Sequence, residues 1–276
     1  CKVHRVNVRI VRLGWNDTMR GTVIDLFCGA GGLSEGFRQA GFRVLAGQDI
    51  DTKAGETFVR THPEAIFLGG PIQDIDAESL LSQTDLRPGE LDVLVGGPPC
   101  QGYSVYNHQR GVHDPRAGLF REYLRIVGGL KPKWLVMENV SGITSIANGA
   151  IVAEIQREMG KLGYRVEMQV LKAEDYGVPQ ARRRMVFIAT RTDQPIRFPK
   201  PTHGPDLLPY VNIWDAFSDR QVIENGESAE GLRYRSKHKN TYQNTLRANA
   251  MRVANHSAPR LSTVNIQRML HIPEGG

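Results

Sequence analysis

The 276-residue chain is poor in the features that mark secreted, membrane-spanning or metal-stapled proteins. It has three cysteines, Cys1, Cys28 and Cys100, and none belongs to a Cys-x-x-Cys pair, so we expect neither a disulfide framework nor a zinc site. No run approaches the roughly 18 apolar residues of a membrane-spanning helix. Residues 1–20 mix arginines with valines, unlike the apolar core of a secretory signal. We therefore expect a cytoplasmic protein without a membrane anchor or a bound metal.

The composition is that of an ordinary globular protein, with 40% hydrophobic and 23% charged residues. This length allows one large α/β domain with an incomplete appendage. The net charge of +6 and the isoelectric point near 9.3 are compatible with a polyanionic partner, because basic surfaces concentrate around phosphate groups. Many basic proteins bind no nucleic acid, so the charge alone does not identify the partner.

From Thr22 onward, apolar runs closed by Gly, Pro or Asp alternate with stretches of helical spacing. This alternation is typical of a mostly parallel sheet with helices on both faces. One stretch, residues 151–162, repeats its apolar positions at helical spacing and predicts a crossover helix. The sequence therefore predicts an α/β fold with a doubly wound sheet. Its predicted strands are Thr22–Phe27, Phe42–Gln48, Ala65–Leu68, Leu91–Val95, Trp134–Met137, Arg165–Leu171 and Met185–Thr190.

The texture of the sequence changes after about Arg191. Five prolines fall between residues 195 and 209, and residues 224–255 have few apolar anchors. We therefore divide the chain into an N-terminal extension (1–20), a domain (21–192) and an irregular extension that leaves this domain (193–276).

A glycine-rich turn follows the first predicted strand. Gly29, Gly31 and Gly32 lie between that strand and a predicted helix, and glycine permits the positive φ angles and close approach that a nucleotide-like ligand requires. The dinucleotide pattern Gly-x-Gly-x-x-Gly is absent, so an ordinary tight turn is the competing interpretation. About twenty residues later the second strand ends at Asp49 and Asp51, where such folds place an acid on the ribose hydroxyls. Solvated surface acids are the alternative.

The loop after Leu91–Val95 presents one thiol. Pro98 and Pro99 precede Cys100 at the carboxyl edge of the sheet, where open α/β folds bind ligands. A lone cysteine is usually an inert buried hydrophobe, but a rigid surface loop is a poor place for a core residue. Glu138 ends another apolar strand; it either caps the next turn or has a raised pKa and acts as a general acid.

Three arginines, Arg182 to Arg184, stand directly before the last predicted strand. Ordinary surface arginine is the default explanation. A cluster at this edge would also supply donors for phosphate or a developing anion. By strand alternation, Arg182 and Arg184 point to one side and Arg183 to the other.

Together these segments closely resemble the cytosine carbon-5 DNA methyltransferases of bacterial modification systems. The similar segments are Asp25–Ser34 (cofactor), Pro98–Gln101 (nucleophile), Asp114–Phe120 (the intervening segment), Glu138–Val140 (acid) and Gln180–Arg184 (arginines). The resemblance extends from about Thr22 to the C-terminus. It implies a Rossmann-like fold of the S-adenosylmethionine-dependent methyltransferase type, double-stranded DNA as substrate and a place in a restriction-modification system.

The resemblance also implies a role for each matching residue. Cys100 would attack carbon 6 of a flipped-out cytosine, helped by Arg182, and protonated Glu138 would bind ring nitrogen 3 while Arg184 or Arg182 holds the carbonyl oxygen. Gln101 and Ser104 would contact the flipped nucleotide and its phosphates. The residues assigned to S-adenosylmethionine are Phe27, Gly29, Gly31, Asp49, Ile50, Ile72, Pro98 and Leu119.

Two departures from the family pattern stand out. The family usually has Gly-Asp-Ile against the cofactor adenine, whereas this chain has Gly70-Pro71-Ile72, so cofactor affinity is altered or Asp74 compensates. The segment Asn255–Gly276 resembles the one just before the target-recognition region, and we expect a missing C-terminal part or a second chain to supply recognition.

Three other interpretations remain open. An RNA cytosine methyltransferase would use the same chemistry, although Gln101–Ser104 resembles the DNA enzymes. A cofactor-binding subunit of a split enzyme would be inactive alone. A nicotinamide dehydrogenase is disfavoured because the dinucleotide pattern is missing and the Pro-Pro-Cys loop would have no role.

Overall fold

The computed structural model describes residues 20–99, 118–237, 239–247 and 250–273, apart from the side chains of residues 146–148. The chain forms two compact units. The first comprises Cys1–Leu171 and Arg183–Pro199, and the second comprises Lys172–Arg182 and Lys200–Gly276. The second unit thus begins seven residues after the domain boundary predicted at 192/193, and it also includes a loop, residues 172–182, that sequence composition did not single out.

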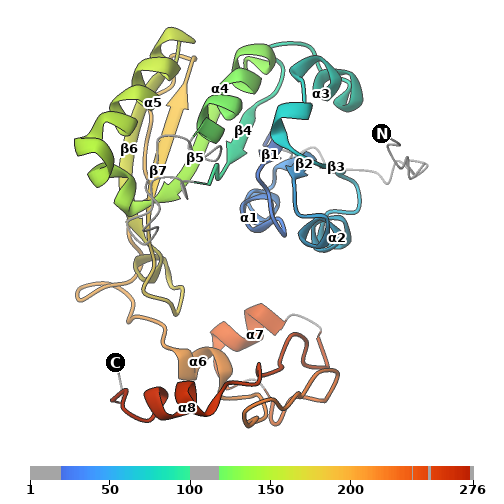
Figure 1. Ribbon diagram of the computed structural model, residues 1–276, viewed down its shortest axis with the longest axis vertical. Coiled ribbons are helices and arrows are strands. Elements are labelled where there is room, and N and C mark those ends of the chain that lie inside the picture. Colours follow the sequence, from blue (N-terminus) through green and yellow to red (C-terminus); the bar gives the residue numbers. More distant parts are fainter. Residues whose placement is uncertain (1–19, 100–117, 238, 248–249, 274–276) are drawn as a thin grey trace. The chain divides into compact units, whose positions relative to one another are not determined.

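A seven-stranded sheet in the order β3-β2-β1-β4-β5-β7-β6 organises the first unit (Figure 1). All seven strands predicted from the sequence are confirmed, with small shifts at their ends. Neighbours from β3 to β5 run parallel, whereas β7 runs antiparallel to β5. The strands are β1 (Thr22–Leu26), β2 (Arg43–Asp49), β3 (Ile66–Gly69), β4 (Val93–Gly96), β5 (Trp134–Val140), β6 (Arg165–Lys172) and β7 (Arg183–Thr190).

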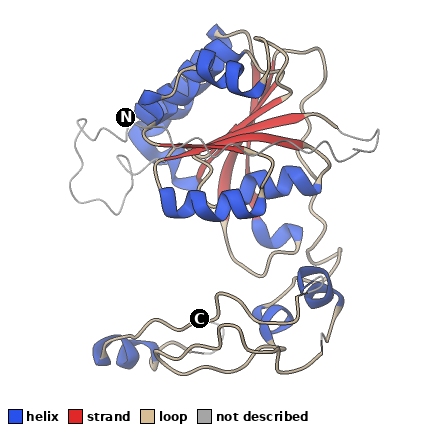
Figure 2. Cartoon of the chain, turned by 90° about the vertical axis from the view of Figure 1, so that its right-hand side faces the viewer, coloured by secondary structure: helices blue, strands red, loops and turns tan. Residues whose placement is uncertain are grey.

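Helices cover both faces of this sheet, which confirms the doubly wound architecture (Figure 2). On one face, α1 (Gly32–Gln39) and α2 (Thr52–Thr61) pack against residues such as Val23 and Val44. On the other face, α3 (Ala77–Thr84), α4 (Leu119–Leu130) and α5 (Ala150–Lys161) enclose the main core with Ile24 and Leu26. Side chains alternate across a strand, so β1 supplies both layers.

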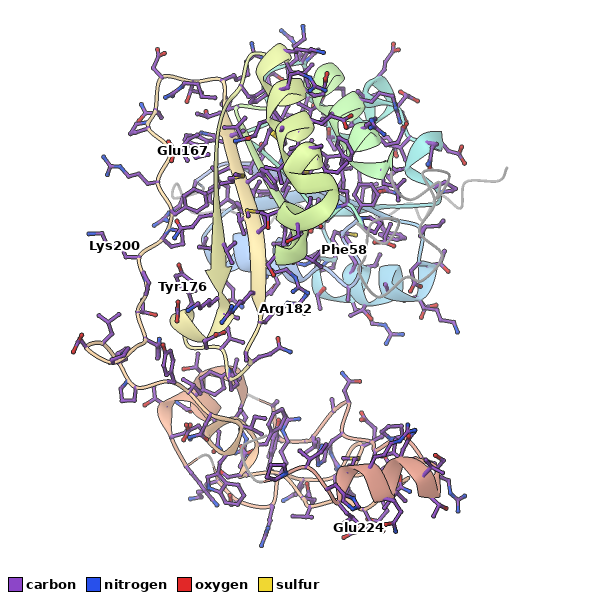
Figure 3. All side chains as sticks on the ribbon, turned by 60° about the vertical axis from the view of Figure 1, so that its left-hand side comes forward. Phe58, Glu167, Tyr176, Arg182, Lys200 and Glu224 are labelled. Carbon is purple, nitrogen blue, oxygen red and sulfur yellow. The ribbon has the colours of Figure 1, made fainter. Side chains whose placement is uncertain are left out.

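Helix α2 packs closely on β2 because Gly47 of β2 has no side chain. Phe58 of α2 is fully buried (Figure 3), and a Cβ atom at Gly47 of β2 would lie 2.4 Å from its ring. A side chain at position 47 would therefore push α2 away from the sheet, because cores have no room for an extra methyl group at this distance. The contact positions the end of β2, where Asp49 lies.

Polar contacts dominate the second unit. Its helices are short: α6 (Ile213–Phe217), α7 (Thr241–Arg247) and α8 (Thr263–Met269). Within its described part, Ala229 and Val253 are the buried hydrophobic residues. An ion pair of 2.8 Å joins Arg247 to the buried Asp219. In the part of the chain that the structure describes, no helix is long and apolar enough to span a bilayer.

Candidate active site

The glycine-rich turn between β1 and α1 has the strained backbone expected of a ligand-binding loop. Phe27 has a φ of 58°, in the left-handed region that a residue with a side chain rarely adopts, and Gly29 and Gly31 have φ values of 52° and 90°. A Cβ atom at Gly29 would meet nothing within 4 Å, so there is open space above the turn. These features fit a turn that leaves room for a bound cofactor, as the sequence predicts.

Asp49 fastens this turn to the end of β2. Its Oδ2 accepts a hydrogen bond of 2.7 Å from the Gly29 amide, and its Oδ1 accepts one of 2.8 Å from the Asp51 amide. The carboxylate therefore shapes the turn, and it offers only its remaining lone pairs to ribose hydroxyls. Next to it, Ile50 is 69% exposed, so an apolar surface stands at the edge of the sheet where an adenine ring would pack.

The segment with the unusual Pro71 is held through its backbone. The buried Gln48 donates from Nε2 to the Gly70 carbonyl at 2.7 Å, and its Oε1 faces the Phe27 amide at 3.5 Å. This one side chain thus connects the glycine-rich turn to the segment after β3. Ile72 begins a 3-10 turn, η1 (Ile72–Asp74), with its side chain buried, whereas Asp74 is exposed.

A buried carboxyl group lies under the glycine-rich turn. Asp25 is fully buried and accepts hydrogen bonds from the Ser34 amide (3.2 Å) and hydroxyl (2.7 Å), while its Oδ1 has no hydrogen-bond partner. Burial raises the pKa of Asp25 to about 6. Burial, together with the negative charges of Asp25 and Asp49, raises the pKa of the Cys28 thiol far above its usual range. Cys28 is therefore an inert thiol, unlike a nucleophile.

Glu138 and Arg184 form an ion pair at the carboxyl edge of the sheet. Arg184 Nε lies 2.7 Å from Glu138 Oε1, and about a quarter of each side chain is exposed. The strand register explains the pairing: Glu138 stands opposite Val186, and Arg184 is two residues earlier on the same face of β7. The Arg184 Nη1 also donates to the Arg183 carbonyl at 2.8 Å, which fixes the guanidinium plane.

The start of the predicted nucleophile loop lies against the end of β5. Asn139, which is 5% exposed, donates from Nδ2 to the Pro98 carbonyl at 3.1 Å. A Cβ atom at Gly97 would lie 3.5 Å from Glu138 Oε2. The structure thus brings together Glu138, Arg184 and the residues that lead into the Pro-Pro-Cys loop.

Other predicted site residues are placed only in part. Cys100, Gln101 and Ser104 lie outside the described residues, so their roles stay predictions. Leu119 is the first residue of α4 and packs on the main core. Arg182 belongs to the second unit, on the same loop as Tyr176 (Figure 3); its amide donates to the Glu174 carboxylate at 3.2 Å and its carbonyl accepts from the Ala173 amide at 2.8 Å. Its expected contact with the thiolate stays a prediction.

Sequence reasoning missed two polar residues of this site, Gln48 and Asn139. Both are polar side chains at the end of an otherwise apolar strand, and both are almost fully buried. The available signal was an amide directly beside a predicted functional acid: Gln48 precedes Asp49, and Asn139 follows Glu138. Since buried amides need hydrogen-bond partners, this position predicts that they hold neighbouring loops.

The fold and the site define a class. This is a Rossmann-like α/β domain with a glycine-rich turn after β1 and an acid–arginine pair at the carboxyl edge of the sheet. The family model for the C-5 cytosine-specific DNA methylase matches residues 21–271. The chain belongs to this family, whose members use S-adenosylmethionine.

Individual relatives agree with this assignment. The chain is 36% identical over 271 residues to the type II methyltransferase M.AgeI of Thalassovita gelatinovora, covering 90% of this chain and 63% of the relative. It is 35% identical to the type II methyltransferase M.DdeI of Desulfomicrobium norvegicum, covering 92% and 61%. A solved structure, of a protein named as a DNA modification methyltransferase encoded within an E. coli prophage, has a TM-score of 0.68 and 28% identity over 82% of this chain and 63% of that one. The chain thus spans somewhat over 60% of the length of these relatives.

Proposed function

We propose that this chain is the catalytic part of a DNA (cytosine-5-)-methyltransferase that methylates carbon 5 of cytosine in duplex DNA. The observation that carries the proposal is the Glu138–Arg184 pair beside Gly97 and Pro98, where the Pro-Pro-Cys loop begins. The description of the matching family supports DNA as the polymer, and the two relatives named as type II methyltransferases support a restriction-modification system as the setting.

Cytosine carbon 5 is a weak nucleophile and needs activation by a temporary covalent bond at carbon 6. The Cys100 thiolate forms this bond, and the electron pair that it displaces moves toward ring nitrogen 3. Glu138 neutralises that charge with a hydrogen bond or proton at nitrogen 3, and Arg184 keeps the Glu138 carboxyl group in place. Because Oε1 already accepts from Arg184, Oε2, the oxygen that faces Gly97, is the one left to contact nitrogen 3.

S-adenosylmethionine supplies the electrophilic methyl group. The transfer would leave S-adenosylhomocysteine. Water would then remove the carbon-5 proton, and its electron pair would re-form the double bond between carbons 5 and 6. The bond between carbon 6 and sulfur would break, its electron pair would return to Cys100, and any proton on nitrogen 3 would return to Glu138. The reacting atoms are inaccessible inside a duplex, so the cytosine must flip out, at a cost of roughly a few kcal/mol. Arg182 stands in this proposal as the residue that stabilises the thiolate and holds the ring oxygen.

We propose that the cofactor is held by residues at or after the ends of β1, β2, β3 and β4 and by the first residue of α4. The turn at Phe27, Gly29 and Gly31 would receive the methionine part, Asp49 the ribose, and Ile50 and Ile72 the adenine, with Pro98 and Leu119 completing the site. Sequence recognition requires contacts to base edges. We propose that a further polypeptide region, on this chain or on a second one, provides them.

The test measures transfer of labelled methyl groups from S-adenosylmethionine to mixed-sequence duplex DNA and, separately, to RNA, followed by identification of the labelled nucleoside. We expect 5-methylcytosine in DNA. Cys100→Ser should abolish the transfer and leave cofactor binding within about threefold. Glu138→Gln should lower the rate by on the order of a hundredfold.

Glu154→Gln is the matched control, because Glu154 pairs with Arg121 on the helical layer and should keep full activity. Label in RNA alone would overturn the choice of polymer. Near-normal transfer by Cys100→Ser would remove the cysteine from the mechanism. Bound cofactor without any transfer would favour the split-enzyme alternative.

A further inference from the structure

Helix α4 holds the 3-10 turn η1 through a single arginine. One guanidinium nitrogen of Arg125, Nη2, donates to two backbone carbonyls, that of Ile72 at 3.0 Å and that of Ile75 at 2.7 Å. Its Nε forms an ion pair of 2.8 Å with Glu122, one turn earlier on the same helix. The planar guanidinium is thereby fixed at three points.

The segment that Arg125 grips leads directly from Pro71. Proline offers neither a side-chain acceptor nor a backbone N–H. Polar recognition of a ligand at this position therefore depends on where the backbone of the neighbouring residues lies. Gln48 fixes one end of this segment through the Gly70 carbonyl, at 2.7 Å, and Arg125 fixes the other. Two side chains from different elements thus determine the course of residues 70–75.

Helix α4 itself begins at the proposed site. Leu119, its first residue, is one of the proposed cofactor contacts, and Arg125 is less than two turns further along the same helix. Helix α4 therefore couples two proposed contacts: it carries Leu119, and through Arg125 it anchors the backbone of the segment that contains Ile72. Displacement of η1 would then change the adenine side of the site and leave the glycine-rich turn, which Asp49 holds at Gly29, in place.

We propose that Arg125 is a positioning residue for the adenine end of the cofactor: it sets the backbone of Ile72–Ile75 against which the purine binds. This inference rests on the proposed function, because it assumes that the ligand of this edge is S-adenosylmethionine. A purely structural role of Arg125 predicts a loss of stability, whereas the positioning role predicts a loss of affinity confined to the adenine.

The experiment compares two ligands on the purified chain. S-adenosylhomocysteine contains the adenine, and S-ribosylhomocysteine is the same molecule without it. Dissociation constants are measured by calorimetry for the first ligand and by ligand-observed NMR for the second, which binds more weakly. Arg125→Lys retains the charge but cannot span two carbonyls and Glu122 at once.

We expect Arg125→Lys to weaken S-adenosylhomocysteine binding about tenfold and to leave S-ribosylhomocysteine binding within about twofold. Glu122→Gln, which keeps both carbonyl contacts, should change neither affinity by more than about twofold. The matched control is Arg121→Lys on the same helix, because Arg121 pairs instead with Glu154 at 2.7 Å; it should leave both affinities unchanged.

An unchanged affinity of Arg125→Lys for S-adenosylhomocysteine would overturn the inference, as would an equal loss for both ligands, which indicates general loosening. If Arg125→Lys does not fold, Arg125→Gln is measured in the same way and judged by the same two ligands. Failure of the unmodified chain to bind S-adenosylhomocysteine would instead refute the proposed function, so the two failures are distinguishable.

Discussion

Adding one methyl group at Gly97 should slow the chemistry without disturbing the fold. The Cβ atom of Gly97→Ala would lie 3.5 Å from Glu138 Oε2 and 4.0 Å from the Glu138 carbonyl oxygen, which is ordinary van der Waals contact. The described φ values give no positive φ at Gly97, so alanine is not strained there. We expect the free energy of unfolding to change by less than about 1 kcal/mol.

The effect on catalysis should be much larger. A hydrogen bond from Glu138 to ring nitrogen 3 requires about 2.6–3.2 Å between heavy atoms, and the new methyl group occupies part of the approach to Oε2. Since a displacement of about 1 Å costs on the order of a hundredfold in rate, we expect kcat for methyl transfer to fall by about ten- to a hundredfold. The affinity for S-adenosylhomocysteine should stay within about threefold.

Two other glycines, Gly96 and Gly142, make the comparison specific. A Cβ atom at Gly96 would lie 2.8 Å from the Leu26 carbonyl oxygen and 2.9 Å from the Tyr123 ring, so Gly96→Ala should destabilise the fold by roughly 1–3 kcal/mol. A Cβ atom at Gly142 would meet nothing within 4 Å, and Gly142→Ala should be neutral. Thermal melts and single-turnover methyl transfer measure both effects. Wild-type turnover by Gly97→Ala would refute the role of Oε2.

Three further predictions follow from the same region. Because the pKa of Cys28 is raised far above its usual range by burial and by Asp25 and Asp49, iodoacetamide at pH 7.5 should alkylate Cys100 and spare Cys28 in the native chain; peptide mapping that finds Cys28 labelled as fast as Cys100 would contradict this. The pKa of Asp25 rises from 3.8 to about 6 on folding, so between these values the unfolded state loses a proton that the folded state keeps, and stability should fall by up to about 3 kcal/mol as the pH rises through this window. Asp25→Asn should remove that fall in denaturant melts from pH 4 to 7, and an identical pH profile would count against it. Since Pro71 has no acceptor for the adenine amino group, the chain should discriminate less than about fivefold against an S-adenosylhomocysteine analogue without that group, and Pro71→Asp should raise the discrimination to tenfold or more; strong rejection of the analogue by the unmodified chain would show that another group reads the amine.

The layers of the fold could be predicted from the sequence because each strand is short, apolar and closed by a turn residue. Because these strands are buried on both faces, their continuous apolar runs identify them as strands even when the strands that they pair with are unknown. The order of the strands was less accessible. Nothing in Met185–Thr190 as a sequence states that it pairs with β5 and runs antiparallel to it, since pairing depends on contacts distant along the chain.

In the candidate site, too, single residues could be predicted from the sequence, whereas the contacts between them could not. Glu138 and Arg184 were predicted as separate residues, from a strand that ends in an acid and arginines that precede another strand. That they contact each other through a 2.7 Å ion pair follows from the register of β5 and β7. Asp49 was predicted to bind ribose, and the structure adds that the same carboxylate holds the Gly29 amide. Gln48 and Asn139 were missed because a single amide side chain has no periodicity, so that its place beside a predicted acid is its one signal in the sequence.

The antiparallel course of β7 explains why an arginine at the start of this strand can serve a site built from the ends of other strands. In the parallel part of the sheet, the carboxyl ends of β1, β2, β4 and β5 meet at one edge. A parallel β7 would carry its first residues to the opposite edge, about a strand length away. Because β7 reverses direction, its first residues pair with the last of β5: Arg184 stands opposite Val140. Insertion of one reversed strand therefore delivers a fixed cation to the edge that Glu138, the glycine-rich turn and the described residues Gly97 and Pro98 already share.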